Sequence, residues 1–388
     1  MPSSLSYRFR RELIQQVAPR YQAAPRAQKM QILNEFVTVT GYARKYAIQL
    51  LNHPGEAKPL SQRFHFPHYG PEVQQALVVA WNAANRICAK RLMPFLPTLL
   101  DSLQRHGHLH LSEKHQAQLL EMSAATADRF LRSQRTAQPH GLSTTKAGTL
   151  LKSQIPIRTF EDWNETRPGF VEADLVAHCG MSPEGGFLYT LTLTDVATGW
   201  TECLPLLNRS RETVLAAFQR ARTLFPFPIL GIDTDNGSEF INEELAAYCE
   251  QEHLTFTRGR PYRKPDQCFV EQKNGTVVRQ VVGYDRFAGE QAYRQLTELY
   301  RALRLYVNCF QPSMKLVSKQ REGKKVRCVY DEAKTPLQRL LLSGILPSDT
   351  QSTLTEIAQA LDPVGLFQQI QRLQQAVFCH AVSRVLST

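Results

Sequence analysis

The residues of this sequence best suited to chemistry are acidic side chains at the ends of predicted strands. The apolar run 227–232 predicts a buried strand that ends in Asp233 and Asp235, and the turn signal Asn236-Gly237 follows. Because side chains alternate along a strand, Asp233 and Asp235 point to the same face, and spacing alone leaves open which of them is functional. Ligands usually bind at the carboxyl ends of strands in α/β sheets, so the pair predicts a site open to solvent.

Two further carboxylates can join this pair. Asp174 lies in a predicted strand over 169–177, and Glu271 lies in a predicted helix, with 35 residues between Asp235 and Glu271. Mg²⁺ prefers carboxylate oxygens and keeps several waters, so a few acidic ligands are enough to hold it. Two Mg²⁺ ions about 3.5–4 Å apart can activate an oxygen nucleophile, relieve charge on a phosphate and stabilise the leaving oxygen. The three carboxylates therefore suit cleavage of phosphodiester bonds.

The same residues resemble the retroviral-integrase superfamily. The resemblance is carried by Asp174 in its strand, the strand exit 194–200 (Thr-Asp-Val-Ala-Thr-Gly-Trp), the segment 235–240 (Asp-Asn-Gly-Ser-Glu-Phe) and Glu271 at its interval. Within that superfamily the chain is most similar to bacterial insertion-sequence transposases, and the similarity is closest over 168–310. The module of two His and two Cys that opens retroviral integrases has no counterpart in this sequence.

This resemblance implies a DDE transposase with an α/β ribonuclease-H-like catalytic core. It assigns Asp174, Asp235 and Glu271 as catalytic and metal-ligating residues, favours Asp235 over Asp233, and implies two Mg²⁺ ions, for which Mn²⁺ can substitute. Such an enzyme cuts at the element end and joins the exposed 3′ hydroxyl to target DNA without a nucleotide cofactor. The expected partners are double-stranded DNA, of the element ends and the target, and further copies of the chain assembled on that DNA. The remaining acidic neighbours are expected to be structural or solvated; they are Glu172, Asp195, Asp233 and Glu239.

Two other functions remain open. A structure-selective nuclease of the same fold would cut DNA without joining it, and a transposase-derived protein could bind DNA without catalysis. Predicted tandem DNA-binding modules argue against the nuclease, and the presence of all three carboxylates argues against the silent binding protein.

Length and composition indicate a multi-domain protein that acts inside the cell. The 388 residues predict two to four domains, no apolar run is long enough to cross a membrane, and the first residues lack the apolar core of a signal peptide. None of the eight cysteines forms a Cys-x-x-Cys pair, so the sequence predicts neither a zinc ribbon nor a disulfide scaffold. We expect a bacterial cytoplasmic protein associated with the nucleoid.

Positive charge is concentrated in the flanks of the chain. Residues 1–168 hold 22 Lys and Arg against 11 Asp and Glu, a net charge of +11, and 311–388 hold 10 against 6, a net charge of +4. Residues 169–310 hold 14 against 18, a net charge of −4. Basic flanks suit the phosphate backbone of DNA, whereas an acidic centre suits bound cations.

Two helical regions predict DNA-binding modules before the core. Helices over 26–37 and 42–52 around a Gly-containing turn have helix-turn-helix spacing, with an ordinary helical hairpin as the alternative. Met30, Leu33 and Val37 are expected to pack in the first helix, and Tyr42, Tyr46 and Leu50 in the second. Helices over 71–86, 90–105, one N-capped by Ser112, and 124–135 form a second candidate module. The residues expected to contact DNA from the two modules are Arg44, Lys45 and Gln49, and Arg129 and Arg132.

The core and the C-terminal region follow. Strands over 169–177, 186–195, 200–206, 228–234 and 255–258, with helices over 210–225, 242–252, 266–283 and 289–310, predict a mixed sheet flanked by helices. A basic hairpin over 314–330 precedes three helices, the last with an apolar stripe, Leu366–Val377, suited to packing or self-association. Further DNA contacts are expected from Arg260, Arg263, Lys264, Lys273, Lys324 and Lys325. The predicted organisation is 1–55 and 70–136 as DNA-binding modules, 137–167 as a linker, 168–310 as the catalytic core, and 311–388 as a basic hairpin and helical tail.

Overall fold

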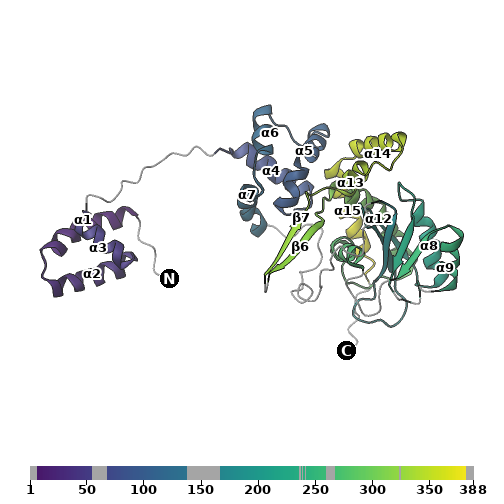
Figure 1. Cartoon of the computed structure of the whole chain (residues 1–388), viewed down its shortest axis with the longest axis horizontal. Coiled ribbons are helices and arrows are strands. Elements are labelled where there is room, and N and C mark those ends of the chain that lie inside the picture. The colour runs from purple at the N-terminus through teal and green to yellow at the C-terminus, as the bar shows by residue number, and fades with distance from the viewer. Residues whose placement is uncertain are drawn as a thin grey trace. The chain divides into compact units, whose positions relative to one another are not determined.

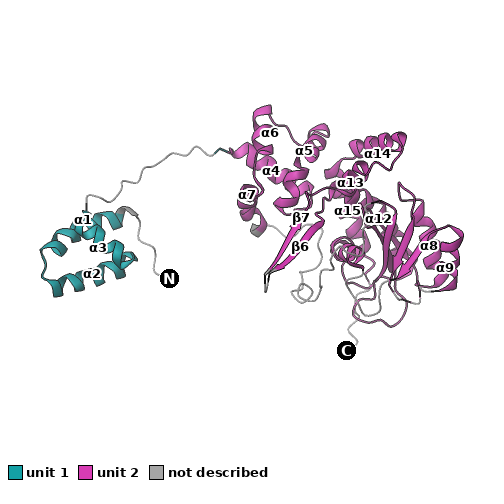
Figure 2. Ribbon diagram, in the orientation of Figure 1, with its two compact units in different colours: residues 1–68 teal, residues 69–388 magenta. Residues whose placement is uncertain are grey.

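The chain forms two compact units, residues 1–68 and 69–388 (Figure 2). The computed structural model describes residues 7–54, 68–137, 167–235, 237, 239–240, 242–258, 267–322 and 325–381. The predicted divisions at 70–136, 168–310 and 311–388 all fall inside the second unit, and residues 138–166 of the predicted linker lie outside the described residues. None of the helices in these described ranges is long and apolar enough to cross a membrane.

The first unit contains three helices (Figure 1). They are α1 (Tyr7–Ala23), α2 (Arg26–Thr40) and α3 (Arg44–Asn52). Gly41 adopts a left-handed φ of 70° and its N–H bonds to the carbonyl of Val37, so α2 runs past the predicted break at Thr38 and ends at this glycine. The apolar side chains buried between the three helices are Ile14, Ala18, Tyr21, Ile32, Leu33, Phe36, Ala47, Leu50 and Leu51.

The predicted packing face of α2 and α3 is wrong at two positions. Met30 is 57% exposed and Tyr46 is 48% exposed, whereas Ile32 and Phe36 of α2 are buried. The prediction paired α2 with α3 alone, but α1 packs against both helices. The buried faces of α2 and α3 are therefore those that also contact α1. Tyr46 instead lies edge-on to Tyr42, with ring centroids 5.3 Å apart.

The second unit is built around a five-stranded mixed sheet. The strands are β1 (Phe170–Ala177), β2 (Tyr189–Asp195), β3 (Thr201–Leu206), β4 (Gly231–Thr234) and β5 (Thr255–Arg258). Their order is β3-β2-β1-β4-β5; β1, β2 and β3 are antiparallel, while β4 and β5 run parallel to β1. This order and these directions are those of the predicted ribonuclease-H-like fold.

The two faces of the sheet differ in chemistry. One face packs apolar side chains, among them Val171, Leu193 and Ile232, against α8 (Arg211–Arg222) and α9 (Glu243–Gln251) (Figure 1). On the other face, β1 presents Glu172 and Asp174 toward α10 (Cys268–Lys273), and α12 (Gly289–Phe310) covers β3. Because side chains alternate along β1, the acidic face and the apolar face are set by neighbouring residues of the same strand.

A helical core joins the residues before the sheet to those after it. The helices α4 (Pro71–Ala83), α5 (Ala89–Arg105), α6 (Glu113–Leu120) and α7 (Ala124–Ala137) share one apolar cluster with α12 and α15 (Pro363–Phe378). Ser112 caps α6 by accepting a hydrogen bond from the N–H of His115, as predicted. The stripe Leu366–Val377 lies in this cluster, with Leu366, Ile370 and Val377 no more than 8% exposed. Its role is therefore internal packing, and its candidacy as a surface for self-association is wrong.

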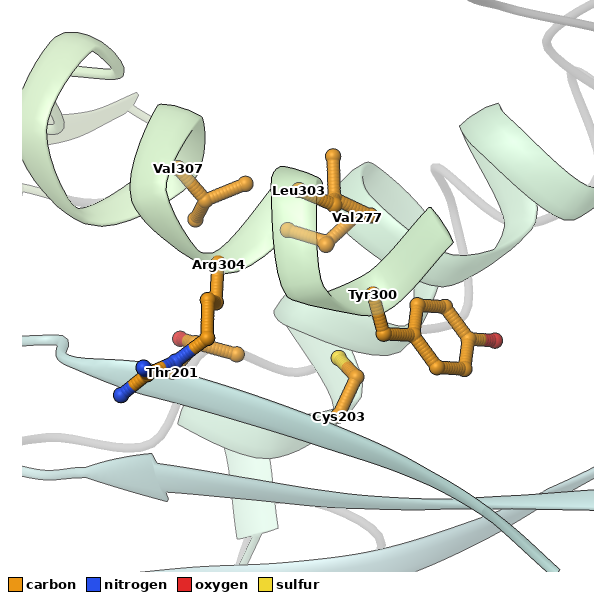
Figure 3. Close-up of a pocket in the computed structure, with 7 residues that line it drawn as sticks. All are labelled: Thr201, Cys203, Val277, Tyr300, Leu303, Arg304 and Val307. Atoms are coloured by element: carbon orange, nitrogen blue, oxygen red, sulfur yellow. The ribbon is translucent and has the colours of Figure 1, made fainter. Parts of the chain in front are cut away.

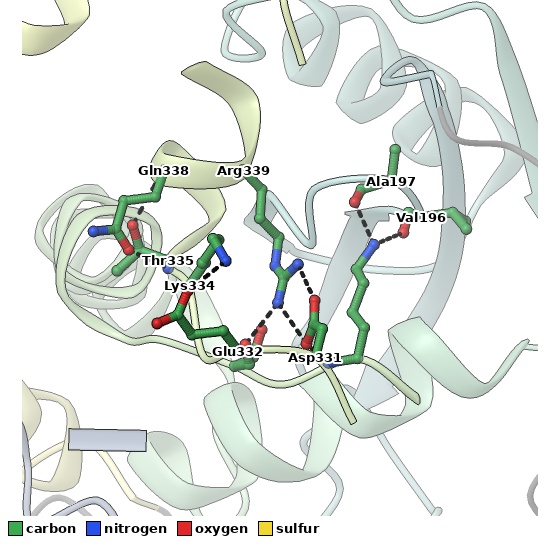
Figure 4. Close-up of polar contacts among 10 residues, drawn as sticks. Val196, Ala197, Asp331, Glu332, Lys334, Thr335, Gln338 and Arg339 are labelled. Carbon is green, nitrogen blue, oxygen red and sulfur yellow. Dashed lines mark hydrogen bonds and ion pairs between the residues drawn. The ribbon is translucent and has the colours of Figure 1, made fainter. Parts of the chain in front are cut away.

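The C-terminal hairpin is tied to the sheet at its base. The strands β6 (Leu316–Glu322) and β7 (Lys325–Tyr330) form a separate two-stranded sheet, longer than predicted. Arg339 of α13 (Pro336–Leu342) donates two hydrogen bonds to Asp331, and the Lys315 amine donates to the carbonyls of Val196 and Ala197 after β2 (Figure 4). The next helix, α14 (Ser348–Ala360), has no buried residue.

A buried ion pair fastens α12 to the edge strand β3. Arg304 donates to both carboxylate oxygens of Glu202, at 2.8 and 2.7 Å, and to the carbonyl of Leu224 after α8. The Glu202 side chain is only 1% exposed and also accepts from the Trp200 ring N–H at 2.8 Å. A small pocket of about 10 Å³ lies beside this contact between α12, β3 and the helical segment over 274–279 (Figure 3). Its lining residues are Thr201, Cys203, Val277, Tyr300, Leu303, Arg304 and Val307.

Loss of Arg304 is expected to leave Glu202 buried without its counter-charge. We expect Arg304→Ala to lower the free energy of unfolding by about 3 kcal/mol, and the pair Arg304→Met with Glu202→Gln to cost less than the single change. The control is Arg301→Ala, which removes an exposed pair with Glu298 on the same helix and should cost less than about 0.5 kcal/mol. Urea denaturation monitored by far-UV circular dichroism gives the three values, and equal costs for Arg304→Ala and Arg301→Ala would contradict the expectation.

Candidate active site

The acidic residues of the candidate site come from two adjacent parallel strands. β1 and β4 are paired so that Glu172 lies in register with Asp233. Alternation then places Asp174 on the same face of β1, and Asp235 on the same side just past the end of β4. Four carboxyl groups therefore lie on one face of the central strand pair, under the helix that carries Glu271.

Asp174 lies at the centre of this group. Its Oδ1 accepts the N–H of Leu175 at 2.8 Å, and its Oδ2 accepts the side-chain N–H of Asn274 at 2.7 Å. The pKa of Asp174 is raised to about 6, mainly by burial and also by the charges of Asp235 and Glu271, while the hydrogen bonds from Leu175 and Asn274 act in the opposite direction. The three carboxylates predicted to be catalytic are therefore electrostatic neighbours, although they are separated by up to 97 positions in the chain.

Asp235 and Glu271 are more open than Asp174. Asp235 is half-buried, and its Oδ1 accepts the N–H of Gly237 at 2.9 Å, while Glu271 is exposed on α10. Among the residues that the structure describes, no three Asp, Glu, His or Cys side chains converge closely enough to hold a metal ion. The donor set fits Mg²⁺, because all three groups offer carboxylate oxygens and their mutual repulsion would be relieved by a cation.

Asp233 and Asp235 have different environments. Asp233 is 4% exposed and its Oδ1 accepts the hydroxyl of Thr257 on β5 at 2.7 Å. A buried carboxylate that is bonded within the sheet is poorly placed to bind an external group. The structural role expected for Asp233 agrees with this environment, as does that of Asp195, which is buried and accepts the N–H groups of Gly169 and Thr198.

Glu172 makes a contact that sequence reasoning missed. Its side chain is fully buried, and its Oε2 accepts the N–H groups of Phe269 and Val270, both at 2.8 Å. Its other oxygen has no hydrogen-bond partner among the described residues, and burial raises the pKa of Glu172 to about 8. The only signal in the sequence was the period of two that places it on the same face as Asp174.

The helix that carries Glu271 changes its winding just after this residue. The single helix predicted over 266–283 is α10 followed by a π-helical segment, η4 (Asn274–Arg279), and a short α11 (Gln280–Val282). Segments of π-helix are rare and are frequent at functional sites. Asn274, the first residue of η4, is the one that bonds to Asp174. It was not among the predicted site residues, and its position three residues after Glu271, hence on the same helix face, was the available signal.

The residues predicted to bind DNA are placed only in part. Arg44, Lys45 and Gln49 are exposed on α3, and Arg129 and Arg132 are exposed on α7. Lys273 is half-buried, near the thiol of Cys203 on β3, and burial lowers its pKa to about 8. Four predicted residues lie outside the described residues, namely Arg260, Arg263, Lys264 and Lys324. Lys325 is the first residue of β7, and its side chain is likewise outside the description.

Comparison with known proteins identifies the domain that contains the sheet. Residues 165–264 match the integrase core domain, which covers β1 to β5 and both Asp174 and Asp235 but ends before Glu271. The chain therefore contains an integrase core domain of ribonuclease-H-like fold. Over 341 residues it is 47% identical to the uncharacterized protein y4rM of Sinorhizobium fredii, a match that covers 87% of this chain and 97% of y4rM. The chain belongs to the same family as y4rM.

More distant relatives match a smaller share of the chain. The Pro-Pol polyprotein of feline foamy virus is 24% identical over 99 residues, which are 26% of this chain and 8% of the polyprotein. Among solved structures, the HTLV-2 integrase catalytic core domain in complex with magnesium is 19% identical, with a TM-score of 0.24 over 28% of this chain and 66% of that one. The catalytic core domain of BIV integrase is 16% identical, with a TM-score of 0.28 over 45% of this chain and 95% of that one.

A buried histidine follows β1 on the same side of the sheet. The Nε2 of His178 bonds to the hydroxyl of Thr190 at 2.7 Å, and Thr190 bonds to the hydroxyl of Tyr300 on α12 at 2.7 Å. The ring packs against Phe287, with centroids 5.9 Å apart. The pKa of His178 is lowered from its ordinary 6.5 to about 3, mainly by burial and also by the positive charge of Arg279. His178 is therefore neutral in the folded protein at pH 7.

Acid is expected to destabilise the second unit through this histidine. A depressed folded pKa contributes stability that is present above the unfolded pKa of 6.5 and is lost as pH falls toward 3. Between pH 7 and pH 4 we expect a loss of about 3 kcal/mol from this group, which His178→Gln should not show. Urea denaturation of both proteins at the two pH values measures the difference, in which the pH-independent cost of the substitution cancels. Equal losses in the two proteins would show that His178 is protonated freely in the fold.

Proposed function

We propose that the protein is a DDE transposase that binds the ends of a mobile element, cuts them and joins their 3′ hydroxyl groups to target DNA. The observation that carries this proposal is the electrostatic neighbourhood of Asp174, Asp235 and Glu271 at the carboxyl end of β4. The integrase core domain supports the general class, polynucleotidyl transfer, without naming the substrate.

Each carboxylate has a distinct part in the proposed chemistry. Asp174 lies between the other two charges and suits a shared ligand of two Mg²⁺ ions, with Asp235 and Glu271 each completing one site. Bound Mg²⁺ supplies charge neutralisation at the phosphate and lowers the pKa of a bound water. The bond from Asn274 holds one oxygen of Asp174 in a fixed orientation. Mn²⁺, with similar oxygen preference, is expected to substitute.

Recognition of the element ends is proposed for the first unit. α2, a tight turn at Gly41 and α3 have the lengths of a helix-turn-helix, and α3 exposes Arg44, Lys45 and Gln49 side by side. The exposed arginines of α7 are a second candidate contact, and the basic tip of the hairpin, with Lys324 and Lys325, is a third. Positive charge in these regions would offset the acidic core when DNA is bound.

Assembly on DNA is proposed to need more than one chain. Each chain has one set of the three carboxylates, whereas an element has two ends to join to one target. Cyclic assemblies of identical chains are the common solution to such a requirement. Because the stripe Leu366–Val377 is buried within the chain, the hairpin over 316–330 remains the candidate contact between copies.

The assignment of the three carboxylates can be tested by neutral substitution. Asp174→Asn, Asp235→Asn and Glu271→Gln should each reduce cutting and joining by more than about a thousandfold, because losing one ligand weakens a shared metal site. Binding to element-end DNA should be unchanged. The matched control is Glu239→Gln, which alters another carboxylate near β4 and should stay active. The assay measures 3′-end cleavage and strand transfer of labelled element-end DNA with Mg²⁺ or Mn²⁺.

Other results of the same assay would redirect the proposal. Cutting without joining in the wild-type protein would favour the nuclease, and DNA binding without either reaction would favour the silent binding protein. An inactive Asp233→Asn beside an active Asp235→Asn would reverse the choice within that pair.

The first unit should bind DNA by itself, because it has its own apolar core. A fragment of residues 1–68 is expected to bind element-end DNA with an affinity that falls steeply as salt rises. Arg44→Ala and Lys45→Ala should each weaken binding by about fivefold to tenfold and reduce the salt slope by about one. Arg20→Ala, which removes an exposed charge from α1, is the control and should have little effect. Fluorescence anisotropy over a salt series gives both quantities. Unchanged affinity in both α3 variants would move recognition to another surface of the first unit, and a fragment that does not bind DNA would move it to α7.

A further inference from the structure

The first turn of the helix that carries Glu271 is held by a side chain from the central strand. The first N–H groups of a helix have no partner within the helix and normally bond to a side chain just before it. Gln267, the residue at that position, makes no such bond to α10. Instead, Glu172 of β1 accepts the N–H groups of Phe269 and Val270, both at 2.8 Å, from 97 and 98 positions away.

Side chains of β1 form hydrogen bonds to the helix both before and after Glu271. Phe269 and Val270 directly precede Glu271, and Asn274, three residues after it, donates to Asp174. Glu172 and Asp174 are alternate residues of β1, so they point to the same face and reach the helix one after the other. The distance between Asp174 and Glu271 is thus set by two contacts that both start from β1.

Glu172 itself is closed off from any substrate. Its side chain is 0% exposed, and the oxygen that bonds to α10 is saturated by two backbone donors. A direct contact with DNA is therefore excluded by its burial, and the group must act through the helix that it holds. Catalytic groups displaced by about 1 Å can lose about a hundredfold in rate, so the position of α10 has consequences for any reaction at this site.

We propose that Glu172 is a positioning residue, which anchors the N-terminus of α10 to β1 and so sets where Glu271 stands relative to Asp174. The catalytic part of this proposal rests on the proposed transposase activity. The anchoring part concerns this chain alone and can be measured without DNA or metal.

Two substitutions separate the effect of the length of the Glu172 side chain from the effect of its ionisable group. Glu172→Gln keeps the length of the side chain and an oxygen that can accept both N–H groups, but it removes the ionisable group. Glu172→Asp keeps the carboxyl group but is one methylene shorter, so it cannot reach Phe269 and Val270 without movement of α10. If Glu172 anchors the helix, Gln is the conservative replacement and Asp is the damaging one.

The expected results follow from this contrast. In hydrogen exchange of the full chain, amides 269–271 should exchange about tenfold faster in Glu172→Asp and remain protected in Glu172→Gln, since a lost cap frees the first turn. In the joining assay, Glu172→Asp should lower kcat by about tenfold to a hundredfold with little change in the KM for DNA, whereas Glu172→Gln should stay within about threefold of wild type. Asp195→Asn is the matched control, because it alters a buried carboxyl group that accepts backbone N–H groups away from α10.

Contrary results are equally specific. Two results would overturn the proposal. One is unchanged amide exchange and unchanged kcat in Glu172→Asp. The other is a Glu172→Gln variant that keeps the protection of amides 269–271 but loses activity, because the charge of the side chain and not its length would then matter. An equal loss of kcat in Asp195→Asn would reduce the effect to general destabilisation and also overturn it. A wild-type protein that neither cuts nor joins DNA would overturn the proposed function, while the exchange result would still decide whether Glu172 anchors α10.

Discussion

The burial of acidic groups along one face of β1 is the constraint on which the rest of the second unit depends. A carboxyl group removed from water costs free energy unless donors surround it, and the fold supplies them from α10, from Asn274 and from the neighbouring strands. This requirement explains why α10 packs directly against β1 at this point. It also explains the raised pKa values of Glu172 and Asp174, which reflect groups that are buried and crowded by like charges.

The opposite face of the same strand supplies most of the cohesion. Val171 and Ala173 alternate with the acidic residues and pack against α8 and α9 in an apolar core. At the edge of the sheet, Arg304 connects α12 to Glu202 and to the end of α8, so the two layers are fixed relative to each other. The apolar face of β1 therefore stabilises the strand whose other face holds the acidic residues. Such compensation is common where a site must hold like charges together.

The helices outside the sheet show why domain boundaries are hard to read from sequence. The segments over 71–137 and 363–378 were predicted as parts of separate modules, yet they bury their apolar faces against α12 in one core. An apolar stripe predicts that a helix packs against other residues, but it does not predict which element those residues belong to. The stripe Leu366–Val377 illustrates this, since the same pattern suited a contact between copies and is in fact internal. The first unit has a boundary that the sequence does show, because Pro and Gly residues follow α3 and its apolar residues suffice for a small core.

The sequence by itself determined the elements of the core and the identity of the acidic residues at its centre. Strand and helix limits agree within a few residues for β1 to β5 and for α12, since short-range periodicity and turn residues decide them. Only the tertiary structure decided which carboxyl groups face each other and how deeply each one is buried. Asp233 is buried against Thr257 while Asp235 stays half-open, and Glu172 holds a helix 97 residues away. These differences come from strand register and from the docking of α10, which join residues that are distant in the chain and leave no local pattern in the sequence.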